Sequence, residues 1–254
     1  MMDQRKFLVI NPTGATAVAA RELERMGQVV TEAPSPSVTH WLLPVPSFNE
    51  DGSLRGSVNF NEITTILAET VTIIGGGLRN LDRNHCWDLL QDESYLAKNA
   101  AITAYCALPM IMNALPVVME GCPVLTIGWG RIGKMLAKLL HQLGADVTVA
   151  SRSPENRAIL AALGYGAEDP TEMSYILGRY RLIINTAPAV TLSEAQLAHR
   201  REDCVLIDLA SVPGLPCSGV ISARGLPGKY APESSGKLIA RTILGFCAQK
   251  EGRI

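Results

Sequence analysis

Residues 123–140 read P-V-L-T-I-G-W-G-R-I-G-K-M-L-A-K-L-L, and this stretch decides the fold. An apolar run typical of a strand leads into three glycines, and an amphipathic helical pattern follows. In such a turn the first glycine allows a tight bend, the second lets the backbone approach a pyrophosphate, and the third lets helix and strand pack closely. The helix then presents unpaired N–H groups and the positive end of its dipole to the phosphates. The stretch therefore predicts a dinucleotide-binding turn with contacts from Gly128, Trp129, Gly130, Arg131, Ile132 and Gly133.

The next expected strand, D-V-T-V-A-S-R-S at residues 146–153, indicates which dinucleotide binds. Enzymes that use NAD usually have Asp or Glu at the end of this strand, where it binds the ribose 2′-hydroxyl. A carboxylate would repel a 2′-phosphate, whereas a serine hydroxyl and a guanidinium can both donate hydrogen bonds to it. Ser151, Arg152 and Ser153 therefore predict NADP as the cofactor. In the alternative interpretation, Ser153 only caps a helix that begins at Pro154, and Arg152 is an ordinary solvated cation.

Two later strands also end in polar residues. In folds of this kind, ligands bind at the carboxyl ends of the parallel strands. We therefore expect further cofactor contacts from Asn185, Thr186, Ala187 and Pro188 after one strand, and from Asp208, Ala210 and Ser211 after the next. Asp208 has a second interpretation, as a strand-end carboxylate that binds backbone N–H groups of its own turn.

Strands and helices alternate along the whole chain, which predicts an α/β fold. From Pro123 onward, nearly all-apolar strands are separated by helical patterns, as in a parallel sheet that is buried on both faces. The first hundred residues repeat this pattern on a smaller scale, with apolar runs at 7–10, 41–45 and 71–74. We expect a Rossmann-type doubly wound parallel sheet domain at residues 99–233. A smaller N-terminal α/β substrate-side domain is expected at residues 1–98 with the C-terminal helix 234–254, in the split-domain arrangement of the 2-hydroxyacid dehydrogenases.

Composition excludes several classes of function. The chain has 254 residues, of which 47% are hydrophobic and 19% charged, and its formal net charge is −1, so nucleic acid is not an expected partner. The apolar run before Asn11 is too short for a signal peptide, and the apolar stretch Ala100–Met119 holds prolines and polar residues typical of a buried helix. We expect a cytoplasmic protein that does not enter a membrane. Six cysteines without C-x-x-C spacing and four isolated histidines predict no metal site and no catalytic histidine.

Substrate contacts are expected outside the nucleotide turn. The loop R-G-L-P-G-K-Y-A-P at residues 224–232 has a composition suited to a rigid loop beside a ligand. Its two cations could hold substrate carboxylates or be ordinary surface residues. The candidate substrate residues are Pro44, Ser47, Thr103, Arg224, Gly225 and Lys229. The polar segment 47–58 is expected to be a mobile surface loop.

Two segments near the C-terminus, D-L-A-S-V-P-G at 208–214 and G-L-P-G-K-Y-A-P-E-S-S-G-K at 225–237, resemble the C-terminal signature of the family of dipicolinate synthase A subunits. The motifs G-W-G-R-I-G, A-S-R-S, N-T-A-P and L-L-P-V-P fall in that family's order and spacing, so the resemblance covers most of the chain. The chain departs from the family in being shorter, mostly in its N-terminal half. The resemblance implies NADP-dependent oxidation of a dihydrodipicolinate-type cyclic dicarboxylate to dipicolinate (pyridine-2,6-dicarboxylate), branching from the lysine pathway during sporulation. It also implies a partner, the flavoprotein-like B subunit of dipicolinate synthase, and we expect the chain to form a homo-oligomer.

Two other functions stay open. A D-2-hydroxyacid dehydrogenase-like oxidoreductase shares the two-domain plan, but those enzymes place an arginine after the fifth strand and a histidine after the sixth. Here these turns read L-A-S-V-P-G and A-R-G-L-P-G, with neither residue in place. A non-catalytic NADP-binding subunit that organises a partner is the other alternative, because no catalytic acid or base is evident.

Overall fold

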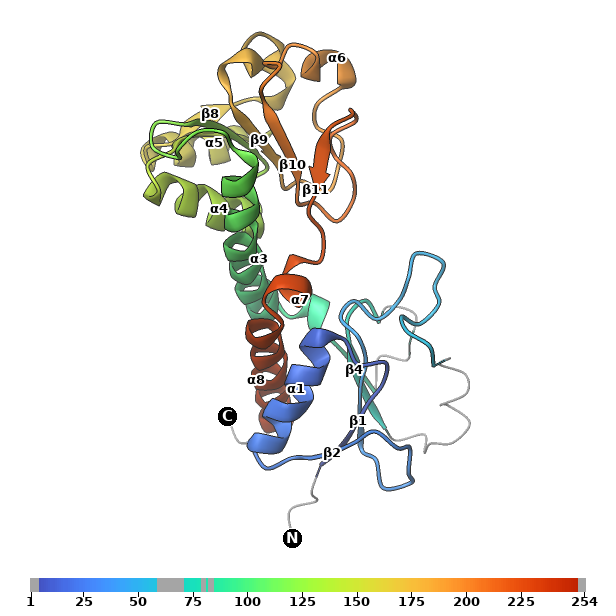
Figure 1. The fold of residues 1–254 in the computed structure, drawn as a ribbon. Coiled ribbons are helices and arrows are strands. Elements are labelled where there is room, and N and C mark those ends of the chain that lie inside the picture. Colours follow the sequence, from blue (N-terminus) through green and yellow to red (C-terminus); the bar gives the residue numbers. More distant parts are fainter. Residues whose placement is uncertain (1–4, 59–70, 79–80, 82–84, 251–254) are drawn as a thin grey trace. The chain divides into compact units, whose positions relative to one another are not determined.

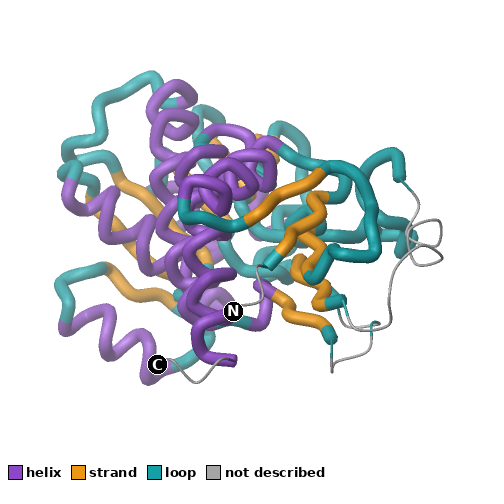
Figure 2. The backbone as a smooth tube through the Cα atoms, turned by 90° about the horizontal axis from the view of Figure 1, so that it is seen from below, coloured by secondary structure: helices purple, strands orange, loops and turns teal. Residues whose placement is uncertain are grey.

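The computed structural model describes residues 5–58, 71–78, 81 and 85–250. The chain divides into two compact units, which we call unit 1 (residues 1–102 and 227–254) and unit 2 (residues 103–226). Both units are α/β layers in which helices run alongside strands (Figures 1 and 2). Each unit has its own parallel sheet, as predicted from the alternating pattern of the sequence.

Unit 2 contains a six-stranded sheet in the order β11-β10-β9-β6-β7-β8. All of its neighbouring strands pair in parallel. The order reverses direction at β6, between β7 and β9, which is the switch point of a Rossmann fold. The strands are β6 (Pro123–Ile127), β7 (Asp146–Ala150), β8 (Gly166–Glu168), β9 (Leu182–Asn185), β10 (Val205–Asp208) and β11 (Val220–Ser222).

The unit 2 sheet is buried on both faces because its central strands are apolar at successive positions. Val124, Leu182 and Ile184 pack with α4 (Arg131–Gln142) and part of α3 (Glu93–Ala114) in one cluster. Leu125 and Ile183, the next residues along, pack in a second cluster. That cluster includes residues of three short helices, η2 (Pro170–Tyr175), η3 (Leu177–Arg179) and α6 (Glu194–Leu197). The helix α5 (Pro154–Ala162) follows β7.

Unit 1 contains a five-stranded parallel sheet in the order β2-β1-β3-β4-β5. Its strands are β1 (Lys6–Val9), β2 (Val29–Thr31), β3 (His40–Leu42), β4 (Thr72–Gly75) and β5 (Cys86–Asp88), and η1 (Leu89–Gln91) follows β5. The helices α1 (Gly14–Arg25) and α8 (Pro232–Lys250) lie side by side (Figure 1). They approach closely at Gly236, where a Cβ would overlap Val18. The short α7 (Leu226–Tyr230) precedes α8.

The apolar stretch that could resemble a membrane span belongs to α3. This helix begins at Glu93, where the Asp92 carboxylate accepts a hydrogen bond from the Tyr95 amide at 2.7 Å, and it includes Pro109. Ala104, Ala107 and Ile111 are fully buried in the core of unit 2. Within the described ranges, no helix has the length and apolarity needed to span a bilayer.

Candidate functional site

The glycine turn of unit 2 has the backbone geometry that its sequence predicts. Gly128 follows β6 directly and has a φ of 99°, which favours glycine. A Cβ at Gly128 would lie 2.9 Å from Thr186 Oγ1, and a Cβ at Gly133 would overlap the Gly128 carbonyl oxygen. The first and third glycines therefore let the turn, the helix and the end of β9 pack against one another.

Gly130 differs from Gly128 and Gly133 in having free space around it. It is exposed, and a Cβ there would meet no atom within 4 Å. It is also the N-cap of α4, and no side chain caps this helix end. The first amides of this 12-residue helix are therefore not bonded to a capping side chain, an arrangement that fits the pyrophosphate of a dinucleotide.

The other residues of the motif surround this helix end. The Trp129 ring packs edge-on against Tyr165 at 5.9 Å, and the Lys134 ammonium lies 5.7 Å from its centre. Arg131 is exposed, whereas Ile132 is half-buried against the core. The side chains of Trp129 and Ile132 therefore support the turn by packing. Only the backbone groups of these two residues are candidates for contact with a phosphate.

The end of β7 carries the three residues predicted to select the cofactor. Ser151 is buried, and its amide donates to the Glu168 carbonyl at 3.0 Å. Arg152 is exposed, and among the described residues no acceptor pairs with its guanidinium. Ser153 caps α5 by accepting a hydrogen bond from the Asn156 amide at 3.2 Å, with Pro154 as the first helical residue. The predicted cap at Ser153 is therefore confirmed.

Arg157 supports this turn, and sequence reasoning missed it. Its guanidinium donates to the Ser151 carbonyl at 2.6 Å and to the Arg152 carbonyl at 3.1 Å. The same nitrogen lies 2.9 Å from the Asp169 carboxylate. Hydrogen bonds from Thr171, with a smaller contribution from Arg157, hold the pKa of the Asp169 carboxyl below its ordinary value. Nothing in the spacing of the sequence shows that these carbonyls and this carboxylate converge on Arg157.

The turn after β9 is held by its own side chains. Asn185 is completely buried, and its amide group donates to Ala187 O and to Asp208 Oδ1, both at 3.0 Å. Thr186 donates its hydroxyl proton to the Ile127 carbonyl at 2.9 Å, which ties the turn to the end of β6. Pro188 is exposed at the end of this turn. Asn185 therefore shapes the turn beside the glycines, and Thr186 lies against them.

The Asp208 carboxylate binds backbone N–H groups of its own turn, as one of its two interpretations predicts. The carboxylate accepts hydrogen bonds from the Ala210 amide at 2.9 Å and from the Gly214 amide at 2.7 Å, in addition to the Asn185 bond. The side chain is 3% exposed, so it orders the turn after β10 instead of facing a ligand. Ala210 is buried and Ser211 is exposed on the same turn.

The predicted substrate residues fall in both units. Thr103, Arg224 and Gly225 belong to unit 2, while Pro44, Ser47 and Lys229 belong to unit 1. Arg224 is exposed, and its Nε donates to the Ala210 carbonyl at 3.1 Å, so it is attached to the turn after β10. Thr103 is buried, Gly225 has a φ of 65°, and the Lys229 ammonium lies 5.5 Å from the centre of the Tyr230 ring.

Ser47 differs from its predicted role as a substrate contact. It is completely buried, its hydroxyl donates to the Pro44 carbonyl at 2.7 Å, and it accepts from the Gly76 amide at 2.9 Å. The Pro44 residue is buried in the same turn. A hydroxyl bonded on both sides to the backbone stabilises the turn, so we do not retain Ser47 among the ligand contacts.

No three His, Cys, Asp or Glu side chains within the described ranges gather in a way that could hold a metal ion. The six cysteines are all free thiols.

Comparison with known proteins places this geometry among dehydrogenase-like folds. No protein-family model matches the chain. The A subunit of dipicolinate synthase of Bacillus subtilis (strain 168) is 29% identical over 134 residues, which cover 50% of this chain and 45% of that protein. Shikimate dehydrogenase (NADP(+)) of Acidiphilium cryptum (strain JF-5) is 32% identical over 131 residues, covering 49% of this chain and 46% of that protein. The chain thus spans less than half the length of these curated relatives.

Solved structures resemble the chain over nearly all of its length. The crystal structure of the dipicolinate synthase A subunit from Bacillus halodurans has a TM-score of 0.86 at 22% identity, covering 98% of this chain and 99% of that chain. The corresponding structure from Bacillus subtilis has a TM-score of 0.84 at 21% identity, covering 100% and 99%. D-lactate dehydrogenase from Escherichia coli has a TM-score of 0.68 at 12% identity, with 98% of each chain covered. These likenesses confirm the predicted Rossmann-type two-domain fold. The similarity to the A subunit of dipicolinate synthase that the motifs predict is confirmed as well. The sequence similarity extends across 50% of the chain, and the similarity of fold extends across nearly all of it.

Proposed function

We propose that this protein is an NADP-dependent oxidoreductase that converts a dihydrodipicolinate-type cyclic dicarboxylate to dipicolinate, acting as the A subunit of a dipicolinate synthase. The observation that carries the proposal is the pairing of two features at the carboxyl edge of unit 2. The uncapped end of α4 lies behind Gly130, and the exposed Arg152 follows the neighbouring strand β7. The first suits a dinucleotide pyrophosphate, and the second suits a 2′-phosphate. The similarity to the dipicolinate synthase A subunit supplies the substrate class.

The proposed oxidation requires the protein mainly to position the substrate ring against the cofactor. The dihydropyridine ring loses a hydride and a proton as it becomes aromatic. NADP+ bound at the glycine turn would be the oxidant that accepts the hydride, and water would take the proton. Aromatisation is favourable, so orientation of the ring and binding of its carboxylates are the main tasks of the chain. We therefore assign no catalytic acid or base.

Individual residues have separate tasks in this proposal. The amides of Gly130 to Gly133 bind the pyrophosphate, and Ser151 and Arg152 bind the 2′-phosphate. Thr186 and Ala187 line the nicotinamide side, because their turn lies against Gly128. Arg224, attached to the turn after β10, is the unit 2 candidate for a substrate carboxylate.

The test is a coupled assay. Dihydrodipicolinate synthase supplies its product to the purified chain with NADP+, and the absorbance of pyridine-2,6-dicarboxylate is followed with and without the B subunit. The proposal expects NADP+-dependent product formation in at least one of the two conditions. Normal NADP+ binding without product in either condition would contradict the oxidation and support a different role.

That different role is a non-catalytic NADP-binding subunit. It is favoured by one observation: the buried polar side chains at the ends of β9 and β10, Asn185 and Asp208, are both hydrogen bonded to the protein itself. In this case the chain raises the activity of a partner when NADP is bound. A titration of the chain into an assay of the partner alone distinguishes this role from catalysis.

A further inference from the structure

The segment 47–58 of unit 1 lies where the parallel strands of that unit end. The Ser47 amide donates to the Gly76 carbonyl at 2.8 Å, and Gly76 immediately follows β4. At the other end of the segment, the Asn11 side chain donates to the Val58 carbonyl at 3.1 Å and accepts from the Val58 amide at 3.0 Å. Asn11 follows β1, so the segment passes from the end of β4 to the end of β1.

This edge of unit 1 is the kind of place where α/β proteins bind ligands. The sheet order β2-β1-β3-β4-β5 reverses direction between β1 and β3, and the segment begins just beyond β3. Ligands of open parallel sheets bind outside the carboxyl ends of the strands, at this switch point. The α7 helix packs at the same edge, since the Gly228 carbonyl lies 3.5 Å from the position of a Cβ on Gly14, the first residue of α1.

The segment is held in place by contacts along its length, in contrast to the mobile loop expected from its composition. Leu54 is buried in a core cluster of unit 1, and Phe48 and Leu54 form an antiparallel bridge. At the tip, the Asp51 carboxylate accepts hydrogen bonds from the amide and the hydroxyl of Ser53 at 2.9 and 2.6 Å. A segment anchored in this way can hold a side chain in one direction.

Arg55 is the side chain that the segment orients. Its amide donates to the Ser47 carbonyl at 2.9 Å, and its Nε donates to the Phe48 carbonyl at 3.1 Å. The side chain is exposed, and its two terminal amino groups have no acceptor among the described residues. A guanidinium fixed through Nε keeps the four N–H groups of its two terminal nitrogens, and one N–H from each forms a fork that matches the two oxygens of a carboxylate.

We propose that Arg55 binds a carboxylate of the ligand at the switch point of unit 1. The ligand class is a small carboxylate, and for the proposed reaction, on which this inference rests for its substrate, it is one of the two carboxylates of the cyclic dicarboxylate. Asp51 Oδ1 accepts hydrogen bonds from Ser53 at the tip, and among the described residues the Asp51 carboxylate forms no ion pair with Arg55.

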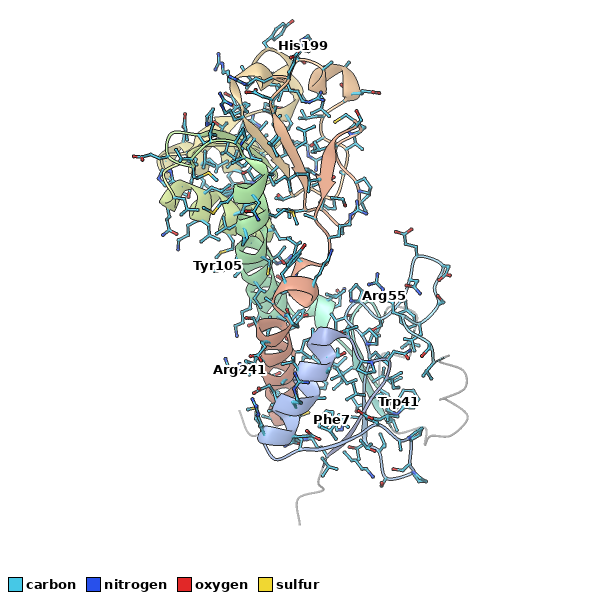
Figure 3. The ribbon with its side chains drawn as sticks, in the orientation of Figure 1. Phe7, Trp41, Arg55, Tyr105, His199 and Arg241 are labelled. Atoms are coloured by element: carbon cyan, nitrogen blue, oxygen red, sulfur yellow. The ribbon has the colours of Figure 1, made fainter. Side chains whose placement is uncertain are left out.

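The experiment measures ligand binding rather than turnover. Pyridine-2,6-dicarboxylate, pyridine-2-carboxylate, oxalate and pyruvate are titrated calorimetrically into the full chain with NADP+ present, using wild type, Arg55→Ala, Arg55→Lys and Arg241→Ala. Arg241 is a matched control, since it is an exposed arginine of unit 1 that lies on α8, away from the segment (Figure 3). Melting temperature and NADP+ affinity report whether each variant is folded.

We expect Arg55→Ala to weaken carboxylate binding by about ten- to a hundredfold, the range for loss of charge-assisted hydrogen bonds. Arg55→Lys recovers part of the loss, and Arg241→Ala and NADP+ affinity stay at the wild-type level. Equal carboxylate affinity in Arg55→Ala and Arg241→Ala overturns the inference, as does a wild type that binds none of the four probes. Wild type that binds oxalate or pyruvate through Arg55 but not the pyridine acids supports Arg55 while contradicting the proposed substrate.

Discussion

Gly133 and Gly130 belong to the same turn, but we expect the first to matter for packing and the second for cofactor binding. A methyl group at position 133 would overlap the Gly128 carbonyl, whereas one at position 130 meets open space. We expect Gly133→Ala to lower the free energy of unfolding by about 1–3 kcal/mol, the usual cost of overpacking. Gly130→Ala keeps the stability of the cofactor-free protein but weakens NADP binding, because the methyl group stands where the pyrophosphate approaches. Thermal melts with and without NADP+ measure both effects, and equal loss of stability in the two variants would contradict this division.

Arg157 offers a second prediction at the residue scale. Its removal leaves the Ser151 and Arg152 carbonyls without their donor, so the turn that we propose to select the cofactor loses its support. We expect Arg157→Ala to weaken NADP binding more than NAD binding. Arg179→Ala, an exposed arginine of the same unit, serves as the control. Calorimetric affinities for both cofactors decide the point, since a merely structural role for Arg157 would reduce the two affinities equally.

Features with a local cause were predictable from the sequence. The close approach of Gly133 to Gly128 and the Ser153 cap depend on residues a few positions away. Asn185 and Asp208 bind each other across 23 residues, and Ser47 binds Gly76 across 29. Residue type alone does not tell whether such a polar side chain faces a ligand or the protein, so these inward orientations could not be predicted from the sequence.

Among the elements, the buried central strands were predictable, and two of the four edge strands were not. The runs V-L-T-I, V-T-V-A, L-I-I-N and V-L-I-D form β6, β7, β9 and β10 as expected. The edge strands β5 and β8, C-W-D and G-A-E, have no apolar run, whereas the edge strands β2 and β11 begin with the apolar pairs V-V and V-I. The expected strand 41–45 ends at Leu42, since Pro44 has no N–H for continued pairing.

The helix α3 provides a prediction about pH at the element scale. Burial raises the pKa of Tyr95 from 10.0 to about 12. The folded state therefore retains the phenolic proton above pH 10 while the unfolded chain releases it, so this contribution to stability is present below pH 10 and is lost as the pH rises toward 12. We expect Tyr95→Phe to flatten the fall in melting temperature between these pH values.

Tyr105→Phe is the matched control for this change, because Tyr105 is 59% exposed on the same helix (Figure 3). Melting curves from pH 8 to pH 12 compare the two variants with wild type. Parallel pH profiles for Tyr95→Phe and wild type would show that the burial of Tyr95 has no effect on alkaline unfolding.

The whole molecule combines two parallel sheets, each with a switch point and with polar or glycine-rich turns beyond the strands. Only unit 2, within the described ranges, places a G-x-G-x-x-G turn at its switch point, and unit 1 places the anchored segment 47–58 there. Alternating strands and helices made the plan of two α/β domains predictable from the sequence, because each unit forms its sheet from strands that follow one another along the chain. The segment's anchors could not be predicted, since they come from Asn11 and Gly76, which lie outside it.

We propose that unit 2 binds NADP(H) at the glycine turn and selects it through Arg152. Calorimetric titration of NADPH and NADH into wild type and Arg152→Ala tests both parts of this proposal. We expect wild type to bind NADPH more tightly than NADH, and Arg152→Ala to remove most of the difference while leaving NADH affinity unchanged. Equal affinity of wild type for the two cofactors, or an undiminished preference in Arg152→Ala, would contradict it.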